Sequence, residues 1–361
     1  MKLMLALALV AAVACVPAAS AKSVANATAA NGPPASVARY FTDVAGAAGR
    51  RYDLKDDTGK QMACTHVVPG THAPYVALSH AQVGSEFEVR LATSDDLLSW
   101  TFGHAVLPNA DMPYPFTVAA NGWVVVVHEQ WMNAGSQLPS RLGFKLWYNA
   151  SDLAAGAPPF NSFLAPLTVG AHSQLEGTPN VYGASMVTRQ GLQTLDLVVG
   201  FHYNDRDGVD QVAQGALTSF GPASLTPSWA ARAATAYDQK FIAAGAIGNI
   251  GQRDAGALDG VDFVLQEGNV GHMPPTIWAD WRVWLYVRAP GEPLPPTGAG
   301  TPYQLAVRTD KGSTAFGNPS VVVLQCPGGR DGGQCVFVSY FIFGEGAAPG
   351  EAGNLVFYHR L

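Results

Sequence analysis

One short pattern recurs along the chain and limits the folds open to it. A segment ending in proline leads into a β-strand, and a turn and a stronger apolar strand follow. The pattern begins at residues 112–116, 177–181, 273–277 and 317–321. The second strands cover 123–130, 195–203, 282–288 and 336–343, and third strands cover 142–148, 210–217, 303–308 and 355–359. Short apolar runs bounded by Gly, Pro, Asn and Asp are typical of strands, so we expect an all-β chain.

A fifth unit stands at the start, where strands are expected over residues 60–68, 74–80 and 86–93. Repeated units of three or four strands are typical of a β-propeller. We therefore predict a five-bladed β-propeller over residues 39–361, with three- to four-stranded antiparallel blades. The interval between Pro179 and Pro275 is the longest, and it predicts a long insertion or an extra hairpin over residues 236–271.

The N-terminal residues have the features of a secretion signal. An apolar run from Leu3 to Val16 precedes Ala19-Ser20-Ala21, the small-residue pattern that signal peptidase accepts. We expect residues 1–21 to be removed, residues 22–38 to be a flexible leader, and the mature chain to be secreted and extracellular. Asn26 and Asn149 lie in Asn-x-Ser/Thr sequons, which accept N-glycans in a eukaryotic host.

The charge balance points away from nucleic acid and from membrane surfaces. Charged residues make up 13% of the chain, the net charge is −6, and Lys and Arg form no cluster that would neutralise phosphates. Tyr and Trp supply flat amphipathic faces of the kind on which sugar rings stack. We expect a monomer that binds a neutral polysaccharide or oligosaccharide. The chain has no Gly-x-Ser-x-Gly elbow, phosphate loop or dinucleotide fingerprint, and no cofactor is expected.

Two cysteines frame a turn-rich loop near the C-terminus. Cys326 and Cys335 flank eight residues rich in Gly between two apolar runs. In an oxidising compartment this spacing favours a disulfide that closes a hairpin, and the alternative is two free thiols at strand ends. Cys64 has no evident partner in the mature chain, and we expect a small buried residue there.

Three pieces of the sequence resemble glycoside hydrolases of family 43 and their five-bladed relatives. They are residues 92–102 (ATSDDLLSWTF), residues 176–179 (EGTP) and residues 56–62 (DDTGKQM). The resemblance implies a central cavity lined by three carboxylates on the inner strands of blades one to three. Inversion at an anomeric carbon needs a protonated acid on one side and a carboxylate holding water on the other, and a third carboxylate keeps the acid protonated.

The resemblance assigns a role to one carboxylate in each of three blades. Glu176 matches the general acid, and Asp111 matches the residue that modulates its pKa. In the first blade the expected Asp-Pro pair is absent, so Asp57, or Asp56 beside it, is the candidate base. A second alignment places residues 69–74 at this position, and the site then lacks its base.

Histidines and tryptophans near the blade starts are candidates for sugar binding. The alternative is that the histidines are hydrogen-bonded filler and that the tryptophans pack in the core. No metal-ligand spacing is present, so no metal site is expected. The candidates are His66, His72, Trp131, His202, His272 and Trp278.

Two functions follow from these observations. The first is an inverting glycosidase that hydrolyses O-glycosidic bonds of a polysaccharide of plant or algal type. The second is a non-catalytic carbohydrate-binding or extracellular-matrix propeller that has lost its base. A propeller that binds protein and no glycan is a third alternative.

Overall fold

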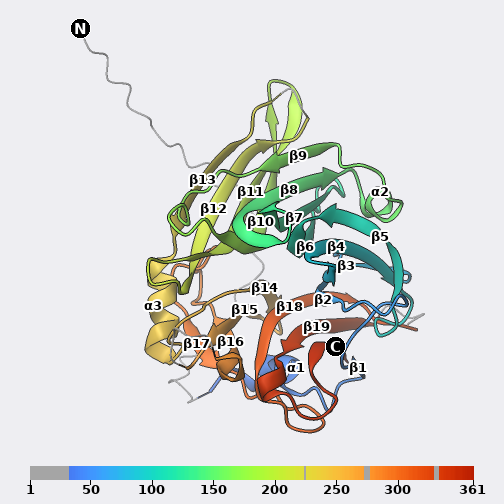
Figure 1. Cartoon of the computed structure of the whole chain (residues 1–361), viewed down its shortest axis with the longest axis vertical. Coiled ribbons are helices and arrows are strands. Elements are labelled where there is room, and N and C mark those ends of the chain that lie inside the picture. Colours follow the sequence, from blue (N-terminus) through green and yellow to red (C-terminus); the bar gives the residue numbers. More distant parts are fainter. Residues whose placement is uncertain (1–31, 223–224, 272–276, 329–332) are drawn as a thin grey trace. The chain divides into compact units, whose positions relative to one another are not determined.

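The computed structural model describes residues 32–222, 225–271, 277–328 and 333–361. Within Pro33–Leu361, five four-stranded antiparallel sheets are arranged as the blades of a propeller (Figure 1). The predicted all-β class and the five-bladed architecture are confirmed. The predicted signal peptide, Asn26 and His272 lie outside the described residues.

The first three blades follow one another along the chain, and each is built from four consecutive strands. Blade 1 contains β2 (Ala63–Val67), β3 (Tyr75–Val83), β4 (Glu86–Ser94) and β5 (Thr101–Pro108). Blade 2 contains β6 (Ala110–Thr117), β7 (Val124–Asn133), β8 (Ser136–Trp147) and β9 (Asn161–Leu164). Blade 3 contains β10 (Glu176–Arg189), β11 (Leu192–Asn204), β12 (Asp210–Phe220) and β13 (Ser228–Ala233). The short helix α2 (Ala150–Ala154) connects β8 to β9.

Blade 4 differs from the sequence prediction. It contains β14 (Arg253–Leu258), β15 (Val261–Asn269), β16 (Trp281–Val287) and β17 (Thr301–Gln304), and helix α3 (Thr235–Ala244) precedes it. The segment expected to be an insertion therefore supplies the two inner strands. The prediction failed because β14 begins with polar Arg253 and Asp254, and because Pro274 and Pro275 resembled the start of an inner strand.

Blade 5 joins the two ends of the described chain. It contains β18 (Phe316–Gln325), β19 (Gln334–Ile342), β20 (Gly353–Arg360) and, outermost, the N-terminal strand β1 (Gly49–Arg51). Strand β1 pairs with β20, with Gly49 opposite Tyr358. The ring of blades is therefore closed by hydrogen bonds between residues from opposite ends of the sequence.

The propeller domain begins before residue 39, where the boundary was predicted. Helix α1 (Ala35–Thr42) starts inside the segment expected to be a flexible leader. Its residues Val37 and Phe41 are fully buried in a cluster shared with blades 4 and 5, and the hydroxyl of Tyr340 donates to the carbonyl of Phe41 at 3.0 Å. These apolar contacts order the helix against the blades.

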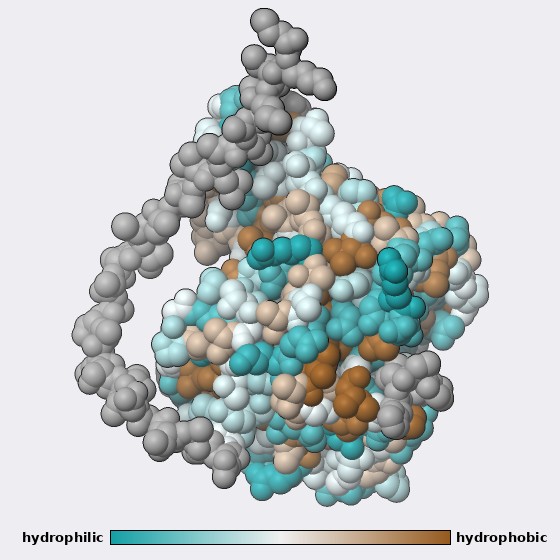
Figure 2. Space-filling model, turned by 90° about the vertical axis from the view of Figure 1, so that its left-hand side faces the viewer, coloured by the Kyte–Doolittle hydropathy of each residue, from teal (hydrophilic) through white to brown (hydrophobic). Residues whose placement is uncertain are grey.

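The apolar core lies between neighbouring blades. Between blades 2 and 3, for example, Val127 and Phe144 pack with Leu197 and Phe201. Burying each such side chain contributes about 1.5–3 kcal/mol. Figure 2 shows one face of the molecule, where apolar (brown) areas are interrupted by polar (teal) ones. Among the described helices, none has the length and apolar composition needed to cross a bilayer.

A disulfide joins Cys326 and Cys335, as predicted, and Cys64 is a buried free thiol. The disulfide closes a loop between β18 and β19 with a sequence separation of 9. Replacing both Cys326 and Cys335 by serine should lower the free energy of unfolding by about 2–3 kcal/mol, because the unfolded chain regains the entropy of an open loop. Urea denaturation of the variant and of the oxidised wild type measures this difference, and equal midpoints would contradict it.

Candidate functional site

Four of the five inner strands begin in the same strained way. Each has a residue with positive φ at a point where the register with the second strand shifts. In three of them a proline follows this residue. Proline cannot donate a hydrogen bond to the neighbouring strand, so within sheets it is found at bulges and strand starts such as these. The residues, with their φ angles, are Cys64 (51°), Met112 (46°), Thr178 (47°) and Asn318 (48°). This bulge is the structural basis of the recurring proline in the sequence.

Three of these residues are tied to the preceding blade. In each case their backbone N–H donates to a side chain near the end of that blade's second strand. The acceptor–donor pairs are His80 with Met112 at 3.2 Å, Glu129 with Thr178 at 3.2 Å, and Glu267 with Asn318 at 2.5 Å. Polar groups are thereby brought to one end of the blades, around the centre of the propeller.

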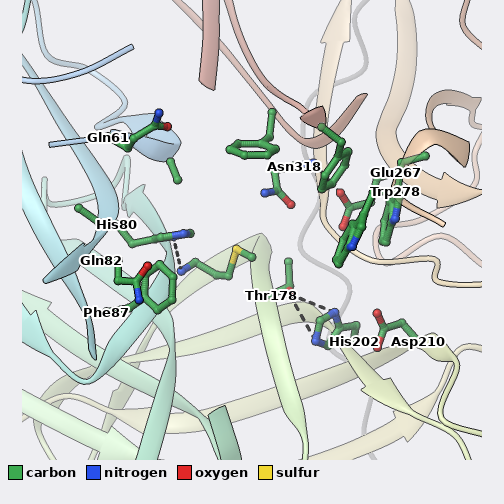
Figure 3. A pocket seen from close by; sticks show the side chains of 16 residues that line it. Gln61, His80, Gln82, Phe87, Thr178, His202, Asp210, Glu267, Trp278 and Asn318 are labelled. Carbon is green, nitrogen blue, oxygen red and sulfur yellow. Dashed lines mark hydrogen bonds between the residues drawn. The ribbon is translucent and has the colours of Figure 1, made fainter. Parts of the chain in front are cut away.

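A cavity of about 460 Å³ opens at this end (Figure 3). Its size falls in the range of small-molecule sites. His80 and Phe87 from blade 1 lie on one side, and Trp278 lies on the other beside Glu267 (Figure 3). Thr178 and residues of the β11–β12 hairpin also line the cavity. The cavity thus combines an aromatic surface with a few convergent polar groups.

The aromatic surface opposite blade 1 is made of stacked rings. Trp278 lies parallel to Trp281, with 6.0 Å between ring centroids and 13° between planes. Trp278 also stacks on Phe343 at 5.1 Å. The side chain of Trp278 is 44% exposed, whereas Trp281 is buried behind it. A large ring held flat and left open to the cavity is suited to packing against the apolar face of a sugar.

Two carboxylates line the cavity, and both come from residues that the sequence did not identify. Asp210 begins β12, and its Oδ1 accepts from the Asn204 side chain at 2.5 Å. Burial raises the pKa of Asp210, while nearby His202 lowers it. Burial also raises the pKa of Glu267, to about 7, against the opposing effect of two backbone donors, Asn318 N–H and Gln252 N–H. Glu267 is therefore protonated in part of its population near neutral pH.

A second pair of carboxylates lies beside the cavity without lining it. Asp111 on β6 and Glu129 on β7 face each other across the blade 2 ladder and are both buried. Burial raises both pKa values, and the charge of Glu129 raises that of Asp111 further. The candidate modulator Asp111 is thus located near the centre, next to a carboxylate that the sequence analysis did not identify.

Glu176 does not line the cavity. Its Oε1 accepts three hydrogen bonds, from the backbone N–H of Thr168 at 2.7 Å, from the Thr168 hydroxyl at 2.9 Å and from the N–H of Gly170 at 2.9 Å. Glu176 is 1% exposed. The carboxylate therefore holds the loop that precedes blade 3, and Thr178, two residues later, is the residue that lines the cavity.

The candidate bases Asp57 and Asp56 also serve the fold. Asp57 is exposed, and its Oδ1 accepts from the N–H of Phe102 at 2.8 Å. Asp56 is buried, accepts from the N–H groups of Thr58 and Lys60, and pairs with Arg90 at 2.9 Å. Neither lines the cavity, and neither do Glu176 and Asp111.

The predicted sugar-binding residues divide into two groups. His202 and Trp278 line the cavity. Trp131 is buried behind the wall, with its ring 5.2 Å from Phe87. His66 is buried, its Nδ1 lies 3.1 Å from the Cys64 carbonyl oxygen, and burial lowers its pKa to about 4. His72 is exposed and lies outside the lining.

Of the two carboxylates that line the cavity, only Glu267 has a sequence signal that could have identified it. Glu267 follows the run Phe263-Val264-Leu265-Gln266, which has the composition of a second strand but lies in the interval predicted to be an insertion. Asp210 begins the third strand predicted over residues 210–217, but nothing in the local sequence distinguishes it from a turn acid. Among the described residues, no group of three or more His, Cys, Asp or Glu side chains is arranged to hold a metal ion.

Solved structures share the arrangement of these blades. The structure of BT0996 in its RGII complex superposes with a TM-score of 0.51 and 10% identity, over 85% of this chain and 90% of that protein. The sucrose-6-phosphate hydrolase of Lactobacillus gasseri superposes with a TM-score of 0.50 and 10% identity, over 88% of this chain and 62% of that enzyme. The likeness is one of fold. A five-bladed propeller is thus common to this chain and to glycoside hydrolases.

Other comparisons set the limits of this likeness. The GH32 β-fructofuranosidase BmSUC1 of Bombyx mori gives a TM-score of 0.47 at 10% identity, over 88% of this chain and 64% of its own. The chain therefore spans less than two thirds of that enzyme and of the sucrose-6-phosphate hydrolase. No protein-family model matches the sequence, and no curated protein matches it.

Proposed function

We propose that this protein is a secreted glycoside hydrolase that cleaves O-glycosidic bonds of a neutral glycan in its central cavity. The observation that carries the proposal is the pairing of an open aromatic surface at Trp278 with two carboxylates, Asp210 and Glu267, in one cavity. An aromatic face binds the sugar ring, and two carboxylates are what hydrolysis of a glycosidic bond requires.

Glu267 is the candidate general acid. A pKa of about 7 leaves a proton available for the leaving oxygen at neutral pH. After the proton leaves, the carboxylate is stabilised by the N–H groups of Gln252 and Asn318, which already donate to its two oxygens. The surroundings of Glu267 thus favour the charge that develops during proton transfer.

Asp210 is the candidate general base. It comes from blade 3, whereas Glu267 comes from blade 4, and the two side chains project into the cavity from different elements (Figure 3). A carboxylate on the far side of the sugar from the acid would hold the attacking water, and the product would have inverted anomeric configuration. Proton NMR of the fresh product identifies the anomer.

A non-catalytic glycan-binding propeller is the second candidate. The observation that favours it is the absence of Asp and Glu from β2, the inner strand on which the resemblance requires the base. The two candidates predict the same retention on glycans and differ only in the release of reducing ends.

The test measures reducing-sugar release and retention on arabinan, xylan and galactan, for the wild type and for Asp210→Asn. Asparagine keeps the carbonyl that accepts from Asn204, so the hairpin should be preserved. We expect the wild type to release sugar from one glycan. Asp210→Asn should release sugar from that glycan at least about tenfold more slowly and should still bind the glycan. Retention without release by the wild type would replace the hydrolase with the binding propeller.

A further inference from the structure

A second cavity, of about 540 Å³, adjoins the central one. Its lining comes from the segment before β2 and from blade 5, the two parts of the chain that meet where the ring closes. The lining residues include Asp53, Lys55 and Gln61 from the first part and Phe341 and Gly344 from the second. None of the catalytic roles assigned above involves this cavity.

The two cavities have a common wall. Gln61 and Phe341 line both of them. The aromatic surface of the central cavity reaches this wall, because Phe343 stacks on Trp278 at 5.1 Å and contacts Phe341 at 5.2 Å. A ligand that packs on Trp278 can therefore continue over Phe343 and Phe341 into the second cavity without leaving an aromatic surface.

The polar groups of the second cavity suit hydroxyl groups better than a charged ligand. Lys55 pairs with Asp53 at 2.7 Å, so their charges cancel, and each side chain is 44% exposed. The amide of Gln61 donates to the other Asp53 oxygen at 2.7 Å, which fixes the orientation of the group shared by both cavities. Neutral, hydrogen-bonding residues beside an aromatic ring are complementary to an uncharged sugar.

We propose that the second cavity binds the continuation of a glycan chain whose neighbouring unit occupies the central cavity. The ligand is then a neutral oligosaccharide or polysaccharide that spans both cavities, and a mono- or disaccharide fills only the first. This assignment rests on the proposed function for the identity of the ligand as a glycan, but it requires only binding and no hydrolysis.

The test fills the second cavity with a new side chain. Gly344 lines it, has no positive φ, and a Cβ added there meets no heavy atom within 4 Å. Gly344→Trp should therefore fold and obstruct the cavity. The matched control is Gly183→Trp, because Gly183 has the same free space and lies on β10, away from both cavities.

Calorimetric titrations use arabino-, xylo- and galacto-oligosaccharides from the disaccharide to the hexasaccharide. We expect the wild-type affinity to rise with chain length in one series, and Gly344→Trp to lower the affinity for the longest ligand about tenfold while leaving the shortest unchanged. Gly183→Trp should match the wild type. A wild-type affinity independent of length, or no binding of any series, overturns the proposal. Binding that follows the expected pattern without hydrolysis rejects the hydrolase alone.

Discussion

Replacing Arg253 by methionine should destabilise the protein by about 3–5 kcal/mol, which is the usual cost of removing one partner of a buried charged network. Arg253 is fully buried. Its guanidinium donates to the carbonyl of Gly251 at 2.6 Å and to the side-chain oxygens of Asn180 and Gln266 at 3.3 Å. Methionine removes one donor from each of these buried acceptors. Urea denaturation followed by tryptophan fluorescence measures the loss.

The same substitution should affect the cavity. The charge of Arg253 lowers the pKa values of Asp210 and Glu267. Without it both carboxyls hold their protons to higher pH, so any pH dependence that follows Glu267 should move upward in Arg253→Met. Arg253→Lys keeps the charge and only part of the hydrogen bonding, and it should fall between the two proteins in stability. Equal stability of all three proteins is incompatible with a structural role for the buried cation.

Glu267→Gln should lower kcat by about 10²–10⁴-fold, the usual contribution of a positioned acid. Because the acid must be protonated and its pKa is about 7, the wild-type rate should fall as pH rises through about 7. The variant cannot titrate, so its residual rate should lack this decline. Initial rates from pH 5 to pH 9 on the cleaved glycan show both effects.

Glu129→Gln is the matched control for Glu267→Gln. Glu129 occupies the corresponding place in blade 2, accepts from the N–H of Thr178, and does not line the cavity. Its replacement should leave the decline near pH 7 in place and change the rate by no more than a few fold. If Glu267→Gln retains wild-type activity while Glu129→Gln loses it, the acid has been assigned to the wrong blade.

The fold could be predicted where the local backbone conformation favours a particular residue type in the sequence. The bulge that opens the inner strands places Met112, Thr178 and Asn318 at positive φ, and the proline after each marks the blade. Blade 4 has neither the bulge nor the proline at β14, so the sequence predicts its start at the wrong place. The number of blades and most strands could therefore be predicted from the sequence, whereas the inner strands of blade 4 could not.

The site was less predictable because the direction of a side chain depends on groups far along the chain. Glu176 stands at the start of an inner strand, as a catalytic acid should, but its carboxylate accepts from the N–H groups of Thr168 and Gly170 in the preceding loop. Asp210 and Glu267 reach the same cavity from different blades, and no spacing in the sequence reveals that meeting. The sequence predicted a central cavity with aromatic rings and carboxylates, but Glu176, Asp111 and Asp57 are not among the residues that line this one.

Because blade 5 contains both β1 and β20, its completion during synthesis depends on strands far apart in the sequence. Until the ribosome has added β20, β1 has no partner, and β19 presents an unpaired edge. Such edges are sites of wrong pairing between chains. A chain truncated before β20 would expose both edges. The ring can therefore close only after β20 has been translated, and products truncated before β20 should remain open to proteases and aggregation.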